Sequence, residues 1–413
     1  MMSGMTLYHM WRLFALPANL KRFCGAAVAV SVGLMCTASA APRSSDTSRP
    51  YASYSHGPSA SANYFPIAVW LQSPQNAARY KAAGFNLYIG LWQGPTEAQL
   101  TELKAAGMPV ICEQNAVGLK HTSDPTIVGW MHQDEPDNAQ PMKAADGSQT
   151  YGPCVPPQKI VKEYLEMNRA DPTRPILLNL GQGVADDTWI GRGNGAKPED
   201  YETYVKGGDI TSFDIYPFAS NLHGSGEKNV GFVANGVDRL KRWAGPTRVV
   251  WNCIECSQID GATKPTPAQT RAEVWMSLIH GSRGLIYFVH QFKPAFNEHA
   301  LLDDPAMLTE VTRTNRQIQA LATILNQPDV APCTIVQAGT GKIDIVCKKS
   351  GGVVWLLSVN RTGTACDALL PIQANSGAVA EAQDENRKLQ LGNGQIKDHF
   401  EPWQVHIYRF ARQ

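Results

Sequence analysis

Short runs of apolar residues, rich in β-branched and aromatic side chains, alternate with amphipathic stretches between residues 64 and 327. The short runs predict buried strands, and the amphipathic stretches, bounded by Gly and Pro, predict helices. This alternation is typical of parallel strands joined by crossover helices. Eight strands are expected, at residues 65–70, 85–91, 108–113, 127–133, 175–180, 210–216, 248–254 and 284–290.

The intervening helices are expected at residues 74–83, 96–106, 157–169, 198–206, 231–243 and 267–279, with 305–325 closing the ring. The stretch 115–121, after the third strand, is too short for a good helix. Eight such β/α repeats match a (β/α)8 TIM barrel better than an open doubly wound sheet. The first strand is followed by no Gly-rich phosphate loop, which disfavours a nucleotide-binding fold. We therefore predict an α/β chain whose residues 64–327 form a TIM barrel.

The pattern changes after residue 328, where strands follow one another without helices. They are expected at residues 334–337, 342–347, 353–359, 368–372 and 404–410, separated by Gly and Asn turns. This pattern predicts a small C-terminal all-β sandwich domain over residues 328–413, packed on the barrel.

The first 40 residues have the organisation of a cleavable signal peptide. Lys21 and Arg22 precede an apolar run over residues 23–35, and a small-residue cleavage site ends at Ala40. We expect cleavage after Ala40 and a secreted or periplasmic protein. The apolar run is shorter than a membrane span, so no stable membrane insertion is expected after cleavage. Residues 41–63 are rich in Ser and Pro and predict a flexible leader.

The composition, with 43% hydrophobic and 18% charged residues, is that of an ordinary globular protein. Its formal net charge of +1 gives no electrostatic reason to expect a nucleic-acid partner. Export makes disulfide bonds an expectation for the cysteines that follow the signal segment. We expect one bond between Cys112 and Cys154, and another between two of Cys333, Cys347 and Cys366.

Carboxyl groups follow several of the predicted strands, and in a TIM barrel the catalytic groups stand at these C-terminal strand ends. Glu113 follows the third strand, Glu135 the fourth and Glu255 the seventh. Two carboxyl groups held across one barrel mouth are what glycoside hydrolysis requires, one to protonate the leaving oxygen and one to attack the anomeric carbon.

At these residues the sequence resembles the clan A retaining glycoside hydrolases. The resemblance covers roughly residues 64–413 and implies that Glu135 is the acid/base and Glu255 the nucleophile of a double displacement on a β-linked glycan. The chain departs from the clan at Asp134, where the clan usually has Asn. The segment from Phe213 to Pro217 is similar to one that these enzymes often carry, which implies that Tyr216 donates a hydrogen bond near the nucleophile.

Further side chains near the strand ends are candidates for binding an oligo- or polysaccharide substrate. Sugar hydroxyls call for carboxyl, amide and imidazole partners, and sugar rings stack on exposed aromatic faces. The candidates are Asp134, Asp214, Tyr216, Asn252, Glu113, His290, Trp70 and Trp92.

Two other function classes fit the same residues. A non-catalytic carbohydrate-binding barrel would hold sugar hydroxyls with Asp134 and Glu255 and cleave nothing. A metal-dependent barrel hydrolase would use His132 and His290 with the adjacent carboxyl groups. His132 is expected to point away from Glu135, and no His-Glu-x-x-His motif occurs, so we expect neither a metal nor a cofactor.

Overall fold

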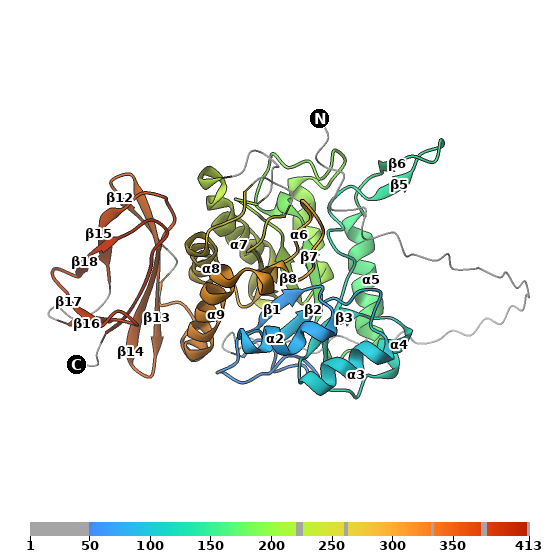
Figure 1. The fold of residues 1–413 in the computed structure, drawn as a ribbon, viewed down its shortest axis with the longest axis horizontal. Coiled ribbons are helices and arrows are strands. Elements are labelled where there is room, and N and C mark those ends of the chain that lie inside the picture. The colour runs from blue at the N-terminus through green and yellow to red at the C-terminus, as the bar shows by residue number, and fades with distance from the viewer. Residues whose placement is uncertain (1–48, 220–225, 260–262, 332–333, 373–377, 411–413) are drawn as a thin grey trace, which may run out of the picture.

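The structure is a computed structural model that describes residues 49–219, 226–259, 263–331, 334–372 and 378–410 (Figure 1). The expected signal peptide over residues 1–40 lies outside the described residues. Within them, no helix is long and apolar enough to cross a membrane.

Residues 67–288 contribute a closed barrel of eight parallel strands. Hydrogen-bonded neighbours follow the order β10-β11-β1-β2-β3-β4-β7-β8-β9. The seventh barrel strand is interrupted at Trp251, so that β9 pairs with β8 while β10 pairs with β11 and closes the ring. The eight strands predicted from the sequence are confirmed as β1 (Ile67–Trp70), β2 (Leu87–Ile89), β3 (Val110–Glu113), β4 (Ile127–Met131), β7 (Ile176–Leu180), β8 (Ile210–Phe213), β9 (Val249–Val250) with β10 (Asn252–Glu255), and β11 (Leu285–Phe288).

Helices surround the barrel, as the apolar periodicity predicted (Figure 1). They are α2 (Ala77–Ala82), α3 (Glu97–Ala106), α4 (Ala116–Lys120), α5 (Pro157–Ala170), α6 (Tyr201–Tyr204), α7 (Gly231–Ala244), α8 (Pro267–His280), α9 (Pro305–Ala320) and α10 (Ala322–Leu325). The helices α3 and α8 begin with reciprocal capping boxes, Thr96 with Gln99 and Thr266 with Gln269. The short stretch after β3 forms the five-residue α4, because the Asn115 side chain caps it.

An insertion after β4 was not expected from the sequence. The strands β5 (Pro141–Lys143) and β6 (Gln149–Tyr151) pair as an antiparallel hairpin that projects from the barrel (Figure 1). Its residues are mostly exposed, so the hydrophobic pattern carries little signal for these strands.

The part of the expected flexible leader that the structure describes packs on the barrel instead. Tyr51 is 2% exposed and belongs to the cluster of side chains that fills the barrel interior. Trp251 Nε1 donates a hydrogen bond of 2.9 Å to the Tyr51 hydroxyl. Hydrogen bonds from His56 N–H to Thr173 O and from Asn326 Nδ2 to Ala62 O also join this segment to the barrel, so tertiary contacts order a stretch whose composition alone predicts flexibility.

The C-terminal domain is a β sandwich that packs beside α8 and α9 (Figure 1). A six-stranded sheet has the order β12-β13-β14-β19-β16-β17, and a two-stranded sheet joins β15 to β18. The strands are β12 (Thr334–Ala338), β13 (Gly341–Ser350), β14 (Val353–Asn360), β15 (Cys366–Pro371), β16 (Val379–Ala382), β17 (Arg387–Gln390), β18 (Gln395–Phe400) and β19 (Val405–Phe410). The sequence predicted five of these and missed β16, β17 and β18, which carry charged residues at their exposed positions.

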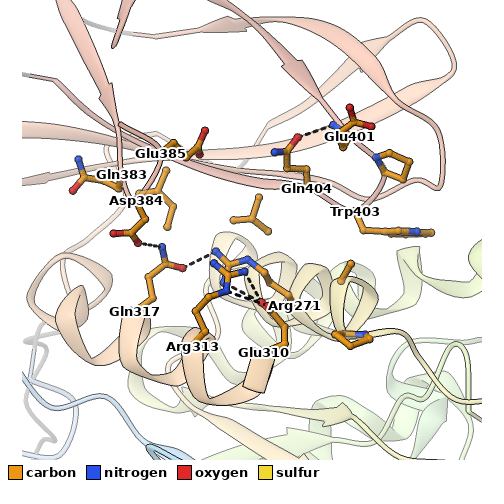
Figure 2. Close-up of a pocket in the computed structure, with 15 residues that line it drawn as sticks. Arg271, Glu310, Arg313, Gln317, Gln383, Asp384, Glu385, Glu401, Trp403 and Gln404 are labelled. Carbon is orange, nitrogen blue, oxygen red and sulfur yellow. Dashed lines mark hydrogen bonds and ion pairs between the residues drawn. The ribbon is translucent and has the colours of Figure 1, made fainter. Parts of the chain in front are cut away.

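A polar cavity of about 460 Å³ lies between the barrel and this domain (Figure 2). Its polar groups largely pair with one another: Arg313 contacts Glu310 at 2.6 Å, and Gln317 Nε2 donates to Asp384 Oδ2 at 2.8 Å. Side chains from both domains therefore join across it.

The cysteine side chains correct the disulfide expectations. Cys112 and Cys154 both carry free thiols, as do Cys347 and Cys366, while Cys333 lies outside the described residues. Cys112 is buried in the core between strands and helices. The β5–β6 insertion, by contrast, leads Cys154 away to a loop where its backbone N–H donates to Asn194.

Candidate active site

Asp134 and Asp214 are brought together at the C-terminal ends of β4 and β8. The Nδ2 atom of Asn179, on β7, donates hydrogen bonds to Asp134 Oδ1 at 2.9 Å and to Asp214 Oδ1 at 3.0 Å. The Ser212 hydroxyl donates to Asn179 Oδ1 at 2.7 Å, which turns the amide nitrogen toward the two carboxyl groups. The two carboxyl oxygens can be no farther apart than the sum of the Asn179 distances, about 6 Å.

These two carboxyl groups have raised pKa values. Burial, and then the charge of Glu135, raises the pKa of Asp134 well above its usual value and that of Asp214 to about 7. Asn179 lowers both pKa values in part, and hydrogen bonds from Cys253 and Tyr216 further lower that of Asp214. Two such groups this close are suited to share one proton near neutral pH, as general acid–base chemistry requires.

Glu135 lies beside this pair and is held by an arginine. Arg192 Nη2 contacts Glu135 Oε2 at 2.7 Å, and the Glu135 side chain is 15% exposed. Its backbone has a φ of 42°, a left-handed conformation that costs a non-glycine residue roughly 1–3 kcal/mol and is found mainly at functional sites.

Arg192 is a site residue that the sequence analysis missed. It lies between Gly191 and Gly193 in the loop after β7, and its own φ is 61°. A lone arginine in a glycine-rich loop after a barrel strand is the signal that was available, because loops at this barrel end carry functional groups.

Glu255 has a different environment, behind the segment that follows β8. It is fully buried, and its two oxygens each accept a backbone N–H, from Phe218 and from Ala219, both at 2.7 Å. Burial raises the pKa of Glu255 to about 7, and these hydrogen bonds partly offset that rise. Glu135 and Glu255, the catalytic pair expected from the sequence, share no interaction partner in the part of the chain that the structure describes.

The other expected binding residues divide between the mouth and the core. Trp92 is half-buried and stacks on His290, with ring centres 5.6 Å apart, and Trp92 Nε1 donates to Glu298. Trp70 is 3% exposed inside the barrel, so its ring is core. Asn252 Nδ2 donates to Ser277 Oγ on α8, outside the barrel.

The remaining candidates are Tyr216, Glu113 and, for the metal-dependent alternative, His132. Tyr216 packs on Phe288 beside Asp214, and Glu113 is exposed at the end of β3. His132 is influenced by Glu163 and Lys159 of α5, as expected for a side chain directed away from the mouth, and burial lowers its pKa to about 4. The described residues contain no group of three His, Cys, Asp or Glu side chains that could hold a metal ion.

Comparison with known proteins identifies the fold and no closer relationship. No family model matches the chain, and no curated protein matches it in sequence. Solved structures that match with a TM-score of 0.53 include AmyP in complex with maltose, with 10% identity over 84% of this chain and 96% of AmyP. An α-amylase from Geobacillus thermoleovorans complexed with acarbose matches at 10% identity over 84% and 98% of the two chains. The α-galactosidase I of Mortierella vinacea matches at 10% identity over 85% and 98%.

This likeness shows that the chain has the fold of these amylases and this galactosidase. The TIM barrel with a C-terminal all-β domain, predicted from the sequence, is confirmed.

Proposed function

We propose that the protein is a glycoside hydrolase in which Asp134 and Asp214 are the two catalytic carboxyl groups. The observation that supports this most strongly is the amide of Asn179, which holds one oxygen of each carboxyl group within hydrogen-bond distance. Both side chains are half-buried at the C-terminal end of the barrel, whereas Glu255 is fully enclosed. The fold of solved amylases and a galactosidase agrees with this chemistry.

The spacing of the pair favours the retaining mechanism. Retaining glycosidases hold their carboxyl groups about 5–5.5 Å apart, whereas inverting enzymes need about 6.5–9.5 Å to admit a water molecule. Asn179 holds one oxygen of each carboxyl group within about 6 Å of the other, which agrees better with the shorter, retaining spacing. In the proposed reaction one carboxylate attacks the anomeric carbon, and the other carboxyl group protonates the departing oxygen and then deprotonates the attacking water.

The hydrogen bonds assign the two roles. Asp214 accepts a hydrogen bond from Asn179, and its pKa is raised only to about 7, so it serves as the nucleophile. Burial and the charges of Glu135 and Asp214 raise the pKa of Asp134 well above its usual value, which favours its protonated form, so it serves as the acid/base. The ion pair of Glu135 with Arg192 fits a tuning role for Glu135 rather than the proton-donor role expected from the sequence.

The substrate proposed is an oligo- or polysaccharide. Whether its glycosidic bond is α or β is a separate question, which the activity panel below also tests. The sequence resemblance favours a β-linked glycan, whereas the named structural neighbours include an α-amylase and an α-galactosidase. Export, expected from residues 1–40, is part of the same proposal, and N-terminal sequencing of the mature protein tests it with Ala41 as the expected first residue.

The experiment is an activity panel of paired α and β aryl glycosides and of polysaccharides, run with residues 41–413 with and without chelator. The variants Asp134→Asn, Asp214→Asn, Glu135→Gln and Glu255→Gln are compared, with the surface change Asp367→Asn in the C-terminal domain as control. We expect Asp134→Asn and Asp214→Asn to lose at least about 10³-fold in kcat. Asp367→Asn keeps full activity.

Three results would contradict the proposal. Full activity in Asp214→Asn would remove the nucleophile assignment. If the parent protein hydrolyses nothing in the panel but binds oligosaccharides measurably, the protein is instead the non-catalytic carbohydrate-binding barrel. Loss of activity on chelation alone would favour the metal-dependent alternative.

A further inference from the structure

We infer that Glu255 is a positioning residue, whose carboxylate fixes the backbone that follows Asp214 and Tyr216. The backbone in question is residues 217–219, here called the clamp segment. This inference rests on the proposed function, because it assigns the chemistry to Asp214 and only the placement of Asp214 to Glu255. It also replaces the nucleophile role expected for Glu255 from its place at the end of the seventh strand.

The contacts of Glu255 show how it acts on the clamp segment. One carboxylate oxygen accepts the N–H of Phe218 and the other accepts the N–H of Ala219, each at 2.7 Å. These two amides lie four and five residues after Asp214 in the chain. A carboxylate offers two acceptor oxygens in one plane, so it satisfies two consecutive buried amides at once.

Other parts of the fold hold the same segment. The Thr263 hydroxyl donates to Phe218 O at 2.7 Å, and the backbone N–H of Gly226 donates to Pro217 O at 2.7 Å. Trp403 of the C-terminal domain packs edge-on against Phe218, with ring centres 5.6 Å apart. Figure 2 shows Trp403 reaching from that domain to the edge of the barrel. The C-terminal domain therefore contributes one side of the clamp.

Glu273 is a second buried carboxyl group beside Glu255. It lies on α8, and burial, followed by the charge of Glu255, raises the pKa of Glu273 well above its usual value. The protonated form is therefore favoured at Glu273, whereas the two backbone amides favour the ionised form of Glu255. A neutral carboxylic acid and a carboxamide are nearly the same size, which supplies a matched control.

The test compares Glu255→Gln with Glu273→Gln, two identical substitutions at adjacent buried sites. Glu255→Gln replaces one accepting oxygen with an amide NH2 group and leaves Phe218 or Ala219 without its acceptor. Because a displacement of about 1 Å costs about 10²-fold in rate, we expect kcat to fall by about 10–100-fold with KM within about threefold. Glu273→Gln mimics the neutral acid and should keep kcat within about threefold.

Two readouts separate a positioning residue from a nucleophile. Azide restores activity to an alanine variant only where the missing carboxyl group took a direct part in the reaction, so we expect no rescue in Glu255→Ala and rescue in Asp214→Ala. A mechanism-based 2-fluoro glycoside should label Asp214, as read by peptide mass spectrometry. Label on Glu255, or azide rescue of Glu255→Ala, would overturn the inference.

Amide hydrogen exchange tests the clamp without any substrate, so its result stands even if the protein hydrolyses no glycoside. In Glu255→Gln the amides of Phe218 and Ala219 should exchange at least about tenfold faster than in the parent protein, while those of β4 are unchanged. Unchanged exchange in the clamp segment would overturn the inference on its own. If the parent protein shows no activity in the panel but the clamp amides of Glu255→Gln exchange faster, only the proposed function is contradicted.

Discussion

Glu135 and Glu255 occupy the same position in the barrel plan and have opposite surroundings. Each follows a parallel strand at the C-terminal end, as a catalytic glutamate would. Glu135 is partly exposed, lies beside two aspartates and pairs with Arg192 from the loop after the neighbouring strand β7. Glu255 is 0% exposed, and its oxygens are used by two backbone amides.

The difference shows that the end of a strand fixes where a side chain starts, and the next loop decides what it meets. After β4 the backbone turns through the left-handed conformation of Glu135 and leaves the two adjacent carboxyl groups at the mouth. After β8 the clamp segment passes over Glu255 and closes it off from solvent. The loop after β4 leaves its carboxyl groups at the mouth, whereas the loop after β8 uses the carboxyl group of Glu255 to hold its own backbone.

The largest expected effect is the loss of kcat when either aspartate of the pair is replaced, and it tests whether the mouth is the catalytic region. Asp134→Asn and Asp214→Asn should each cost at least about 10³-fold in kcat, and the double variant should cost little more than the worse single variant. Groups that act as one catalytic unit are not additive, because removing either one already disables it. Single-turnover kinetics of all three variants measure this, and independent, multiplying losses would show that the two aspartates do not work together.

A smaller effect is expected from Arg192. Its charge lowers the pKa of Asp134, so Arg192→Ala should raise that pKa further. If Asp134 is the general acid, the basic limb of the kcat/KM profile then moves to higher pH, and the loss of the Glu135 ion pair lowers kcat/KM by about 10-fold. Arg192→Lys restores the charge and should return the limb toward the parent position. A limb that moves to lower pH would reverse the acid/base assignment.

Most of the fold was accessible from the sequence, because the apolar runs that form the barrel strands are buried on both faces and stand out from their surroundings. The hairpin β5–β6 and the strands β16–β18 were not predicted, because their solvent-facing and charged residues weaken the alternation of apolar and polar positions that marks a strand. The ordered leader was not predicted because its contacts with distant barrel residues, among them the burial of Tyr51, cannot be read from a Ser- and Pro-rich composition.

The candidate site could be predicted only in part from the sequence, because its contacts join residues that lie far apart in the chain. The sequence placed Asp134, Glu135 and Asp214 at strand ends, and each lies at the mouth. It had no means to show that Asn179 bridges the two aspartates, since that contact joins residues 35 and 45 positions apart. The direction of Glu255 depends on the path of the loop after β8, which no local pattern encodes.

Trp92 and Trp70 offer a further contrast between the mouth and the core. Trp92→Ala removes a half-buried face stacked on His290 and should raise KM by about fivefold with kcat nearly unchanged, as expected for loss of about 1 kcal/mol of stacking. Trp70→Phe should leave KM unchanged and lower the melting temperature, because Trp70 fills the barrel interior. Initial-rate kinetics and thermal unfolding of both variants measure the contrast, and an unchanged KM in Trp92→Ala would place the substrate elsewhere.

The smallest effect concerns stability, where the two regions should respond by different amounts. A carboxyl group with a raised folded pKa binds its proton more tightly in the folded chain, so it destabilises the fold above its unfolded pKa, near 4, and most strongly above the folded pKa. Asp134→Asn should therefore stabilise the protein by about 1 kcal/mol at pH 7, and the gain should vanish near pH 4. Glu255→Gln also removes a carboxyl group with a raised pKa, but it leaves a buried amide without its acceptor at a cost of about 1–3 kcal/mol, so it should be less stable than Asp134→Asn at pH 7. Thermal unfolding from pH 4 to 8 measures both, and a loss of stability in Asp134→Asn at pH 7 would mean that its carboxyl group holds the fold together as Glu255 does.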